Sequence, residues 1–125
     1  MGKEVDLMNE QRIAVLTNAE KASEEIQRQL EHLQYGQVAY FIETTPFFTY
    51  VDEHPGIITI LNYTGPYSVE IAMKLRDRSP SNPLIWFSDL DFGLVSYRVH
   101  ATWFGMLPVT EEKLTKAMKL VGYKN

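Results

Sequence analysis

The sequence predicts an α/β fold in which helices cover both faces of a parallel β-sheet. The first observation is the run from Gly56 to Asn62, which is almost entirely β-branched or aliphatic and ends in one polar side chain. A strand loses its alternation of apolar and polar residues when both faces of its sheet are buried. The second observation is that five such short runs alternate with longer segments. Parallel neighbours require a crossover, which is usually a helix.

The first part of the chain predicts two strands and a helix. Arg12 to Leu16 forms the first apolar run, and Thr17-Asn18-Ala19-Glu20 has the Thr-x-x-Glu form of a capping box that starts a helix. The helix is expected over about Ala19 to Gln34, because apolar residues recur there every three or four positions. These residues are Ala22, Ile26, Leu30 and Leu33. A second strand is predicted over Val38 to Thr44, and Phe47 to Glu53 is either a short helix or a few turns.

The segment after the central run predicts a third helix and a fourth strand. Ser68 is expected to cap the helix, and a loop with two prolines follows at 79–83. The fourth strand is predicted over Leu84 to Ser88. The expected buried face of the third helix consists of Val69, Ala72, Met73 and Arg76.

The last part of the chain predicts a helix, a short strand and a final helix. The fourth helix is expected from 89–91 to about Ala101, and the strand Trp103 to Leu107 ends at Pro108. Thr110 is expected to cap the final helix. Its apolar residues fall at i, i+3, i+4 and i+7, and they are Leu114, Ala117, Met118 and Val121.

Five strands joined by helical crossovers favour a doubly wound, flavodoxin-like sheet in the order 2-1-3-4-5, with the Gly56 run at its centre. Ligands of such sheets bind in a crevice at the carboxyl ends of the strands. The residues expected at those ends are Thr17, Asn18, Asn62, Ser88, Leu107 and Pro108.

Length and composition fit one domain. The chain has 125 residues, of which 45% are hydrophobic and 22% charged, as in an ordinary globule. We expect residues 12–125 to form the domain and residues 1–11 to be a flexible segment. No apolar run approaches the roughly 18 residues that span a bilayer, so a cytoplasmic location away from membranes is expected. The absence of cysteine excludes disulfides, and the net charge of −4 argues against binding nucleic-acid phosphates.

From Arg12 to Val121, the order of these elements resembles the receiver domain of bacterial two-component response regulators, which is CheY-like. The best-matched part is Pro83 to Leu114, with a strand ending in serine, a helix, a short strand bearing an aromatic, and a proline before the last helix. The spacing of Val99-His100-Ala101 is similar to receivers that precede LytTR-type DNA-binding domains. The resemblance implies a cis peptide before Pro108.

The resemblance also implies a set of site positions. In receivers, an acidic pair after the first strand and an aspartate after the third strand hold magnesium, and that aspartate accepts a phosphoryl group. In this chain the acidic pair corresponds to Thr17 and Asn18, and the phosphoacceptor corresponds to Asn62. The family's hydroxyl, lysine and rotating aromatic correspond to Ser88, Leu107 and Phe104. Among the acidic-pair, phosphoacceptor, hydroxyl and lysine positions, only the hydroxyl keeps its family residue.

These replacements predict a degenerate receiver that is not phosphorylated. The amide of Asn62 is not a carboxylate nucleophile, and the neutral oxygens of Thr17 and Asn18 are poor ligands for magnesium. Leu107 offers no cation to phosphoryl oxygens, and the charge of Asp89 would repel a phosphate. We therefore expect no enzyme activity, no bound metal and no cofactor.

Structural roles are expected instead for the remaining polar groups. Thr17 and Asn18 fit a helix cap, and Asn62 is expected to hydrogen-bond across neighbouring strand ends, where it would join the loops in place of a metal. Ser88 is expected to be a structural hydroxyl and Phe104 a fixed part of the core.

Four functions remain open at this point. The first is a signalling module that binds a protein partner, or a second copy of itself, through the face made by the fourth helix, fifth strand and fifth helix. The second is a small-ligand sensor that uses the crevice of neutral groups, and the third is a receiver phosphorylated on Asp89 instead. The fourth is the regulatory domain of a transcription factor. The residues expected on the partner face are Tyr97, His100, Trp103 and Leu114.

Overall fold

The structure, a computed structural model, describes residues 11–123 and contains a five-stranded parallel sheet in the order β2-β1-β3-β4-β5. The strands are β1 (Ile13–Thr17), β2 (Val38–Phe41), β3 (Ile58–Tyr63), β4 (Leu84–Ser88) and β5 (Trp103–Met106). The helices are α2 (Glu20–His32), α3 (Thr44–Glu53), α4 (Ser68–Arg78), α5 (Gly93–Arg98) and α6 (Glu111–Leu120). The predicted fold class and strand order are confirmed. Except for Gln11, the segment expected to be flexible lies outside the described residues.

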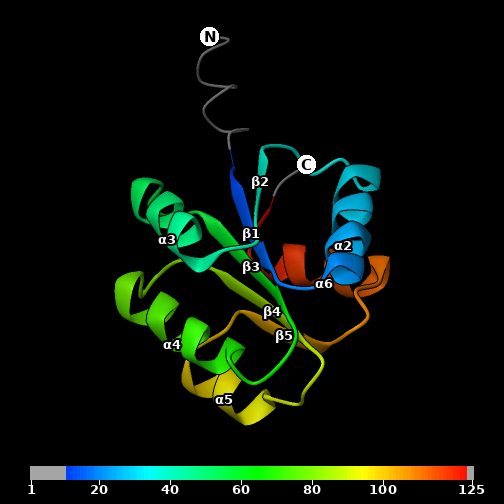
Figure 1. The fold of residues 1–125 in the computed structure, drawn as a ribbon. Helices are drawn as coiled ribbons and strands as arrows, with labels where there is room; N and C mark the ends of the chain where they lie inside the picture. Colours follow the sequence, from blue (N-terminus) through cyan, green and yellow to red (C-terminus); the bar gives the residue numbers. More distant parts are fainter. Residues whose placement is uncertain (1–10, 124–125) are drawn as a thin grey trace, which may run out of the picture.

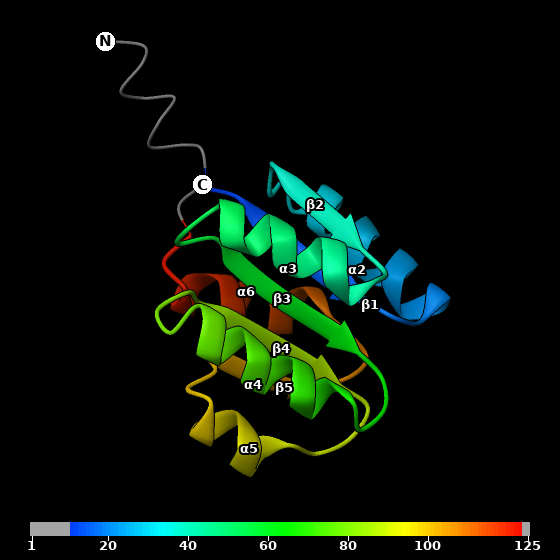
Figure 2. The ribbon, with the colours of Figure 1, turned by 60° about the vertical axis from the view of Figure 1, so that its left-hand side comes forward.

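Helices α2 and α6 cover one face of the sheet, and α3, α4 and α5 cover the other (Figures 1 and 2). Successive residues of a strand point to opposite faces, so β3 supplies Ile58 and Ile60 to the core under α2 and α6, and Leu61 to the core under α3 and α4. Burial on both faces explains why the central run shows no polar alternation.

Two of the three predicted helix caps are wrong. Thr17 is the last residue of β1, where it pairs with Asn62, and the N-cap of α2 is Ala19, which makes no side-chain cap bond. Ser68 lies inside α4, and its hydroxyl donates to the carbonyl of Gly65 at 3.2 Å. The cap at Thr110 is confirmed, because its hydroxyl accepts from the Lys113 amide at 3.2 Å.

The buried face of α4 also differs from the predicted one. The apolar residues that it buries are Ile71, Ala72 and Leu75, whereas Met73 is exposed. Ile71 and Leu75 are four residues apart and form a continuous apolar stripe against the sheet. Met73 lies outside that stripe.

Several boundaries differ for local reasons. Strand β2 ends at Phe41 because the chain turns into α3, a full ten-residue helix, at Thr44. Helix α5 is limited to six residues. On its N-terminal side, the carboxylate of Asp91 accepts from the amide of Gly93 at 3.0 Å, and on its C-terminal side His100 has a φ of 55°. The last helix buries Leu114, Ala117 and Met118 as predicted.

Candidate functional site

The carboxyl ends of the strands are closed instead of forming an open crevice. Thr17, Asn62 and Ser88 each have 0% of their surface exposed. Asn62 and Ser88 therefore present no surface to a ligand, whereas Thr17 lines a hollow beside α2. The expected crevice of neutral groups is absent at Asn62 and Ser88.

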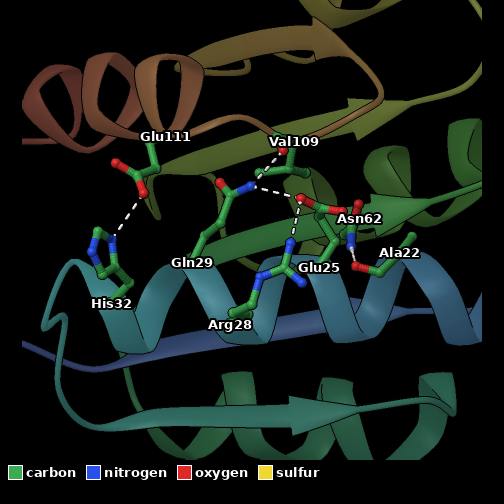
Figure 3. Close-up of polar contacts among 8 residues, drawn as sticks. All are labelled: Ala22, Glu25, Arg28, Gln29, His32, Asn62, Val109 and Glu111. Atoms are coloured by element: carbon green, nitrogen blue, oxygen red, sulfur yellow. Dashed lines mark hydrogen bonds and ion pairs between the residues drawn. The ribbon is translucent and has the colours of Figure 1, made fainter.

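Asn62 joins β3 to helix α2. Its amide nitrogen donates to the carbonyl of Ala22 at 2.8 Å (Figure 3), while its oxygen has no partner within the described residues. The expectation that Asn62 connects neighbouring strand ends is wrong. Its side chain lies on the same face of β3 as Ile58 and Ile60, and that face packs under α2.

Asn18 makes the connection between loops that was expected of Asn62. Its amide nitrogen donates to the carbonyl of Thr64 at 2.9 Å, and its oxygen accepts from the Thr64 amide at 2.8 Å and from the Thr64 hydroxyl at 3.2 Å. Asn18 therefore joins the loop after β1 to the loop after β3, and it does not cap α2.

Asp89 holds the same loop from the other side. One of its carboxylate oxygens accepts from the amide of Gly65 at 2.8 Å, and the φ of Gly65 is 92°, a conformation that favours glycine. The hydroxyl of Ser88 accepts from the Leu90 amide at 3.1 Å, which is a structural role. The loops after β1, β3 and β4 are thus joined by hydrogen bonds of protein groups.

These groups do not fit the magnesium of the resembled family. Asn62 is buried and neutral, and the side-chain oxygen of Asn18 is engaged by Thr64. The nearby carboxylate of Asp89 already binds a backbone amide. Magnesium requires hard anionic oxygens that repay the loss of its waters, and this arrangement offers none in the place of the family's acidic residues.

The loop after β5 holds the predicted cis peptide between Leu107 and Pro108. Leu107 packs its side chain against the core under α2 and α6, and its amide donates to the carbonyl of Ser88 at 2.8 Å. The ammonium of Lys113 donates to the carbonyls of Met106 at 2.7 Å and Pro108 at 3.1 Å. A cation from α6 therefore lies at this loop, but it is committed to the backbone.

A row of polar contacts that the sequence did not reveal joins α2 to the loop after β5 and to α6 (Figure 3). The amide nitrogen of Gln29 donates to the carbonyl of Val109 at 2.7 Å and to Glu25 at 2.9 Å. At the end of α2, the Nδ1 atom of His32 lies 2.8 Å from the Oε2 atom of Glu111 at the start of α6. Gln29 and Val109 are 80 residues apart in sequence, so no local pattern could have linked them.

Arg76 fastens the end of α4 to the turn between α5 and β5. Its guanidinium donates to five backbone carbonyls, at distances of 2.7 to 3.0 Å. Those carbonyls belong to Ser79, Pro80, Asn82, Val99 and His100. Burial lowers the pKa of Arg76, although a guanidinium remains charged at neutral pH. The single guanidinium of Arg76 thus holds both the turn after α4 and the turn after α5.

The expected partner face is exposed at α5 but not at α6. Tyr97 is 80% exposed and Leu94 is 70% exposed. Leu114, by contrast, has no exposed surface and packs under the sheet, so it cannot bind a partner. Its place in the apolar repeat of α6 already indicated an inward position. His100 lies at the exposed end of α5.

Trp103 is only partly available on this face. A Cβ placed on Gly105 would lie 2.1 Å from the indole of Trp103, so the indole lies across the glycine. It also packs against Phe87, with ring centroids 5.1 Å apart. On the other face of β5, Phe104 packs against the edge of Trp86 at a centroid distance of 5.4 Å.

Comparison with solved structures identifies the fold of this chain. The sequence matches no protein-family model and no curated protein. Among solved structures, it is similar to a response regulator receiver domain protein from Clostridium thermocellum, with a TM-score of 0.73 and 19% identity over 89% of this chain and 93% of that chain. The fold is that of a response regulator receiver domain.

Two further receiver-like structures agree. The chemotaxis response regulator CheY4 of Vibrio cholerae has a TM-score of 0.68 at 12% identity, and the comparison covers 89% of this chain and 98% of that one. The CheY-like protein tadZ from Pseudomonas aeruginosa has a TM-score of 0.66 at 19% identity, over 90% of this chain and 99% of that one. The receiver fold therefore spans nearly all described residues. Among them, no helix combines the length and the apolar character that crossing a membrane requires.

Proposed function

We propose that this chain is a signalling module with a receiver fold that acts by binding another protein and does not depend on phosphorylation. The observation that carries the proposal is the exposure of Leu94 and Tyr97, two large side chains one turn apart on α5. Exposed apolar side chains that gather on one surface mark interaction sites. We call the exposed surface of α5 that carries Leu94 and Tyr97 the α5 face.

The closed strand ends support the second half of the proposal. The residue in the phosphoacceptor position, Asn62, is a buried amide, and an amide cannot form an acyl phosphate as a carboxylate does. The carboxylate of Asp89, which follows β4, already accepts from the Gly65 amide. Asn62 instead bonds to α2, and Asn18 bonds to the loop after β3.

The α5 face is tested by a charge placed on it. We expect Leu94→Asp to abolish association with the partner, which can be a second copy of the chain, without lowering the melting temperature, because residue 94 is mostly exposed. The matched control is Met73→Asp, which alters another exposed apolar residue, on α4. Sedimentation velocity measures self-association, and a photo-crosslinker in place of Tyr97 captures a different protein in cells.

Two outcomes would contradict this face as the binding surface. One is a monomer that gives no more crosslinked product from position 97 than from position 73. The other is association that Leu94→Asp and Met73→Asp weaken equally.

The independence from phosphorylation has its own test. Incubation with acetyl phosphate and magnesium, followed by intact mass spectrometry, is expected to leave the mass unchanged. A phosphoryl adduct at full stoichiometry would overturn this part of the proposal, and peptide mapping would show whether Asp89 carries it. A role as a small-ligand sensor at the strand ends is not favoured, because Asn62 and Ser88 are buried.

A further inference from the structure

A hollow of about 580 Å³ lies between the first turns of α2 and the loop that joins β2 to α3. It is at the β2 edge of the sheet, whereas the α5 face is at the β5 edge. We call it the acidic hollow, and its lining includes Thr17, Glu20, Ser23, Glu24, Ile42 and Glu43. It is lined in part by Thr17 and Asn18, which correspond to the acidic pair of the resembled family, but Asn62, Ser88 and the residues of the α5 face do not line it.

Three carboxylates surround the acidic hollow without a cation. Glu20, Glu24 and Glu43 are all exposed. Within residues 11–123, none of the three carboxylates forms an ion pair, since the pairs in that range involve other acidic residues. Three like charges around one concave surface create a negative potential there that attracts cations.

Thr17 supplies a second and independent observation. It lines the hollow, has 0% of its surface exposed, and its hydroxyl oxygen has no hydrogen-bond partner among the described residues. It lies on the same face of β1 as Ile13 and Val15, which is the face covered by α2. Buried polar atoms are almost always hydrogen-bonded, so this oxygen indicates a donor that reaches it from the hollow.

The acceptor oxygens and the apolar residue that line the hollow indicate which class of ligand it can bind. Carboxylate and hydroxyl oxygens accept hydrogen bonds, and Ile42, which is 72% exposed, provides an apolar wall. Within the part of the chain that the structure describes, no three acidic or histidine side chains are placed to hold a metal ion. An alkylammonium group satisfies both features, because its N–H groups donate and its methylenes pack against Ile42.

We propose that the acidic hollow binds a compact primary amine, whose ammonium donates to Thr17 and to the surrounding carboxylates. The partial positive charge at the start of α2, about half a unit, opposes the cation. The three full negative charges outweigh it. The proposal does not rest on the function proposed for the α5 face, and either can fail without the other.

Putrescine is the probe for this site, and 1,4-butanediol is its uncharged counterpart. We expect calorimetric titration of the full chain to show saturable binding of one putrescine per chain and no binding of the diol. The double variant Glu24→Gln, Glu43→Gln is expected to weaken putrescine binding about tenfold or more, since each lost carboxylate removes a charge-assisted hydrogen bond. Both positions are exposed, so the variant should fold normally.

The matched control is Glu53→Gln, Glu70→Gln, which makes the same change in net charge at exposed residues outside the hollow. It should leave the affinity within about twofold of the unmodified chain, since neither carboxylate lines the hollow and dissolved salt screens exposed charges. Equal weakening by the two double variants, or the absence of saturable binding, would overturn the proposal.

Thr17→Val separates ligand binding from a structural role. Valine keeps the shape of the side chain and removes the unpaired oxygen, so the melting temperature of the free protein should hold or rise. The affinity for putrescine should fall, because the acceptor is lost. Unchanged putrescine affinity in this variant would refute the role given to Thr17 and with it the proposal.

Discussion

The carboxyl ends of the strands and the α5 face use their polar and apolar residues in opposite ways. At the strand ends, polar side chains such as Asn62 and Ser88 are buried and committed to protein partners. On the α5 face, apolar side chains such as Leu94 and Tyr97 are exposed and have no partner that the fold requires. The difference teaches that the same fold buries its polar groups at the strand ends and exposes apolar groups on α5.

The two regions also differ in how they are held. Short neutral side chains and one carboxylate join the loops at the strand ends, through Asn18 to Thr64 and Asp89 to Gly65. The turn behind the α5 face is held by a single guanidinium, that of Arg76. Loss of one side chain should therefore lower the stability more at the turn held by Arg76 than at the strand ends. The exception is a substitution that buries a charge at the strand ends.

The largest effect is expected from Asn62→Asp, which restores the family's carboxylate in a site that has closed around an amide. A buried carboxylate without a cation should cost about 3 to 5 kcal/mol at pH 7, and it cannot donate to the carbonyl of Ala22 as the amide does. The measurement is urea unfolding with the unmodified chain as reference.

The pH dependence of this variant follows from burial. Burial raises the pKa of a carboxyl in the folded state above its unfolded value of about 3.9. The loss of stability should therefore grow as the pH rises above about 4 and shrink as the pH falls below it. Gln27→Glu, the same amide-to-carboxylate change at an exposed position on α2, is the control. If Asn62→Asp is as stable as the unmodified chain at pH 7, the strand ends are not closed.

Arg76→Ala is expected to have the next largest effect, a loss of about 3 kcal/mol in the free energy of unfolding. The reason is that five carbonyls lose a charged donor at once. Arg76→Lys should recover only a part, because an ammonium lacks the planar fork of the guanidinium. Urea unfolding gives the stability, and amide exchange at Val99 and Ala101 reports on the turn behind the α5 face. A loss below about 1 kcal/mol would contradict this role of Arg76.

Asn18→Ala should cost less, about 1.5 kcal/mol, because it removes the neutral hydrogen bonds to Thr64 in a partly exposed setting. Gln27→Ala, at an exposed position on α2, is the control and should have almost no effect. Thermal unfolding compares the two variants. Equal melting temperatures would show that Asn18 does not hold the loops together.

The smallest effect is expected at Tyr40, on β2, away from both regions. Burial, with a smaller contribution from Glu31, raises the pKa of Tyr40 to about 12. Because the neutral phenol is favoured in the folded state, its contribution is complete below pH about 10 and is lost as the pH rises through about 12. Tyr40→Phe should remove this part of the alkaline loss, less than about 1 kcal/mol for a half-exposed group. Unfolding at pH 9 and pH 11 measures it, and an equal alkaline loss in both proteins would exclude Tyr40 as a contributor.

Most of the fold could be predicted because its signals are local. The central run of β3 and the apolar repeat of α6 are patterns within a few residues of sequence, and both were confirmed. The two false caps, at Thr17 and Ser68, show the limit of such patterns. A hydroxyl in a cap sequence has other partners available, and for Thr17 the pairing of β1 with β3 prevailed.

The candidate site was predicted in its residues but not in its contacts. The neutral identities of Thr17, Asn18 and Asn62 are plain in the sequence, but their partners are not. Asn62 binds a carbonyl 40 residues away and Asn18 binds a residue 46 away. Leu114 was assigned to a surface although its own periodicity placed it in the core.

The sequence alone predicted the strand order, and it places an amide, Asn62, at the position that corresponds to the phosphoacceptor of the resembled family. Both follow from residue identity and from the pattern of short segments. Only the tertiary structure decided that Asn62 and Ser88 are buried and that Arg76 binds five carbonyls. It also decided that the Thr17 hydroxyl has no hydrogen-bond partner among residues 11–123, beside a hollow lined by three carboxylates. The physical reason is that burial and hydrogen-bond partners depend on which distant segments pack together, and no local pattern encodes that choice.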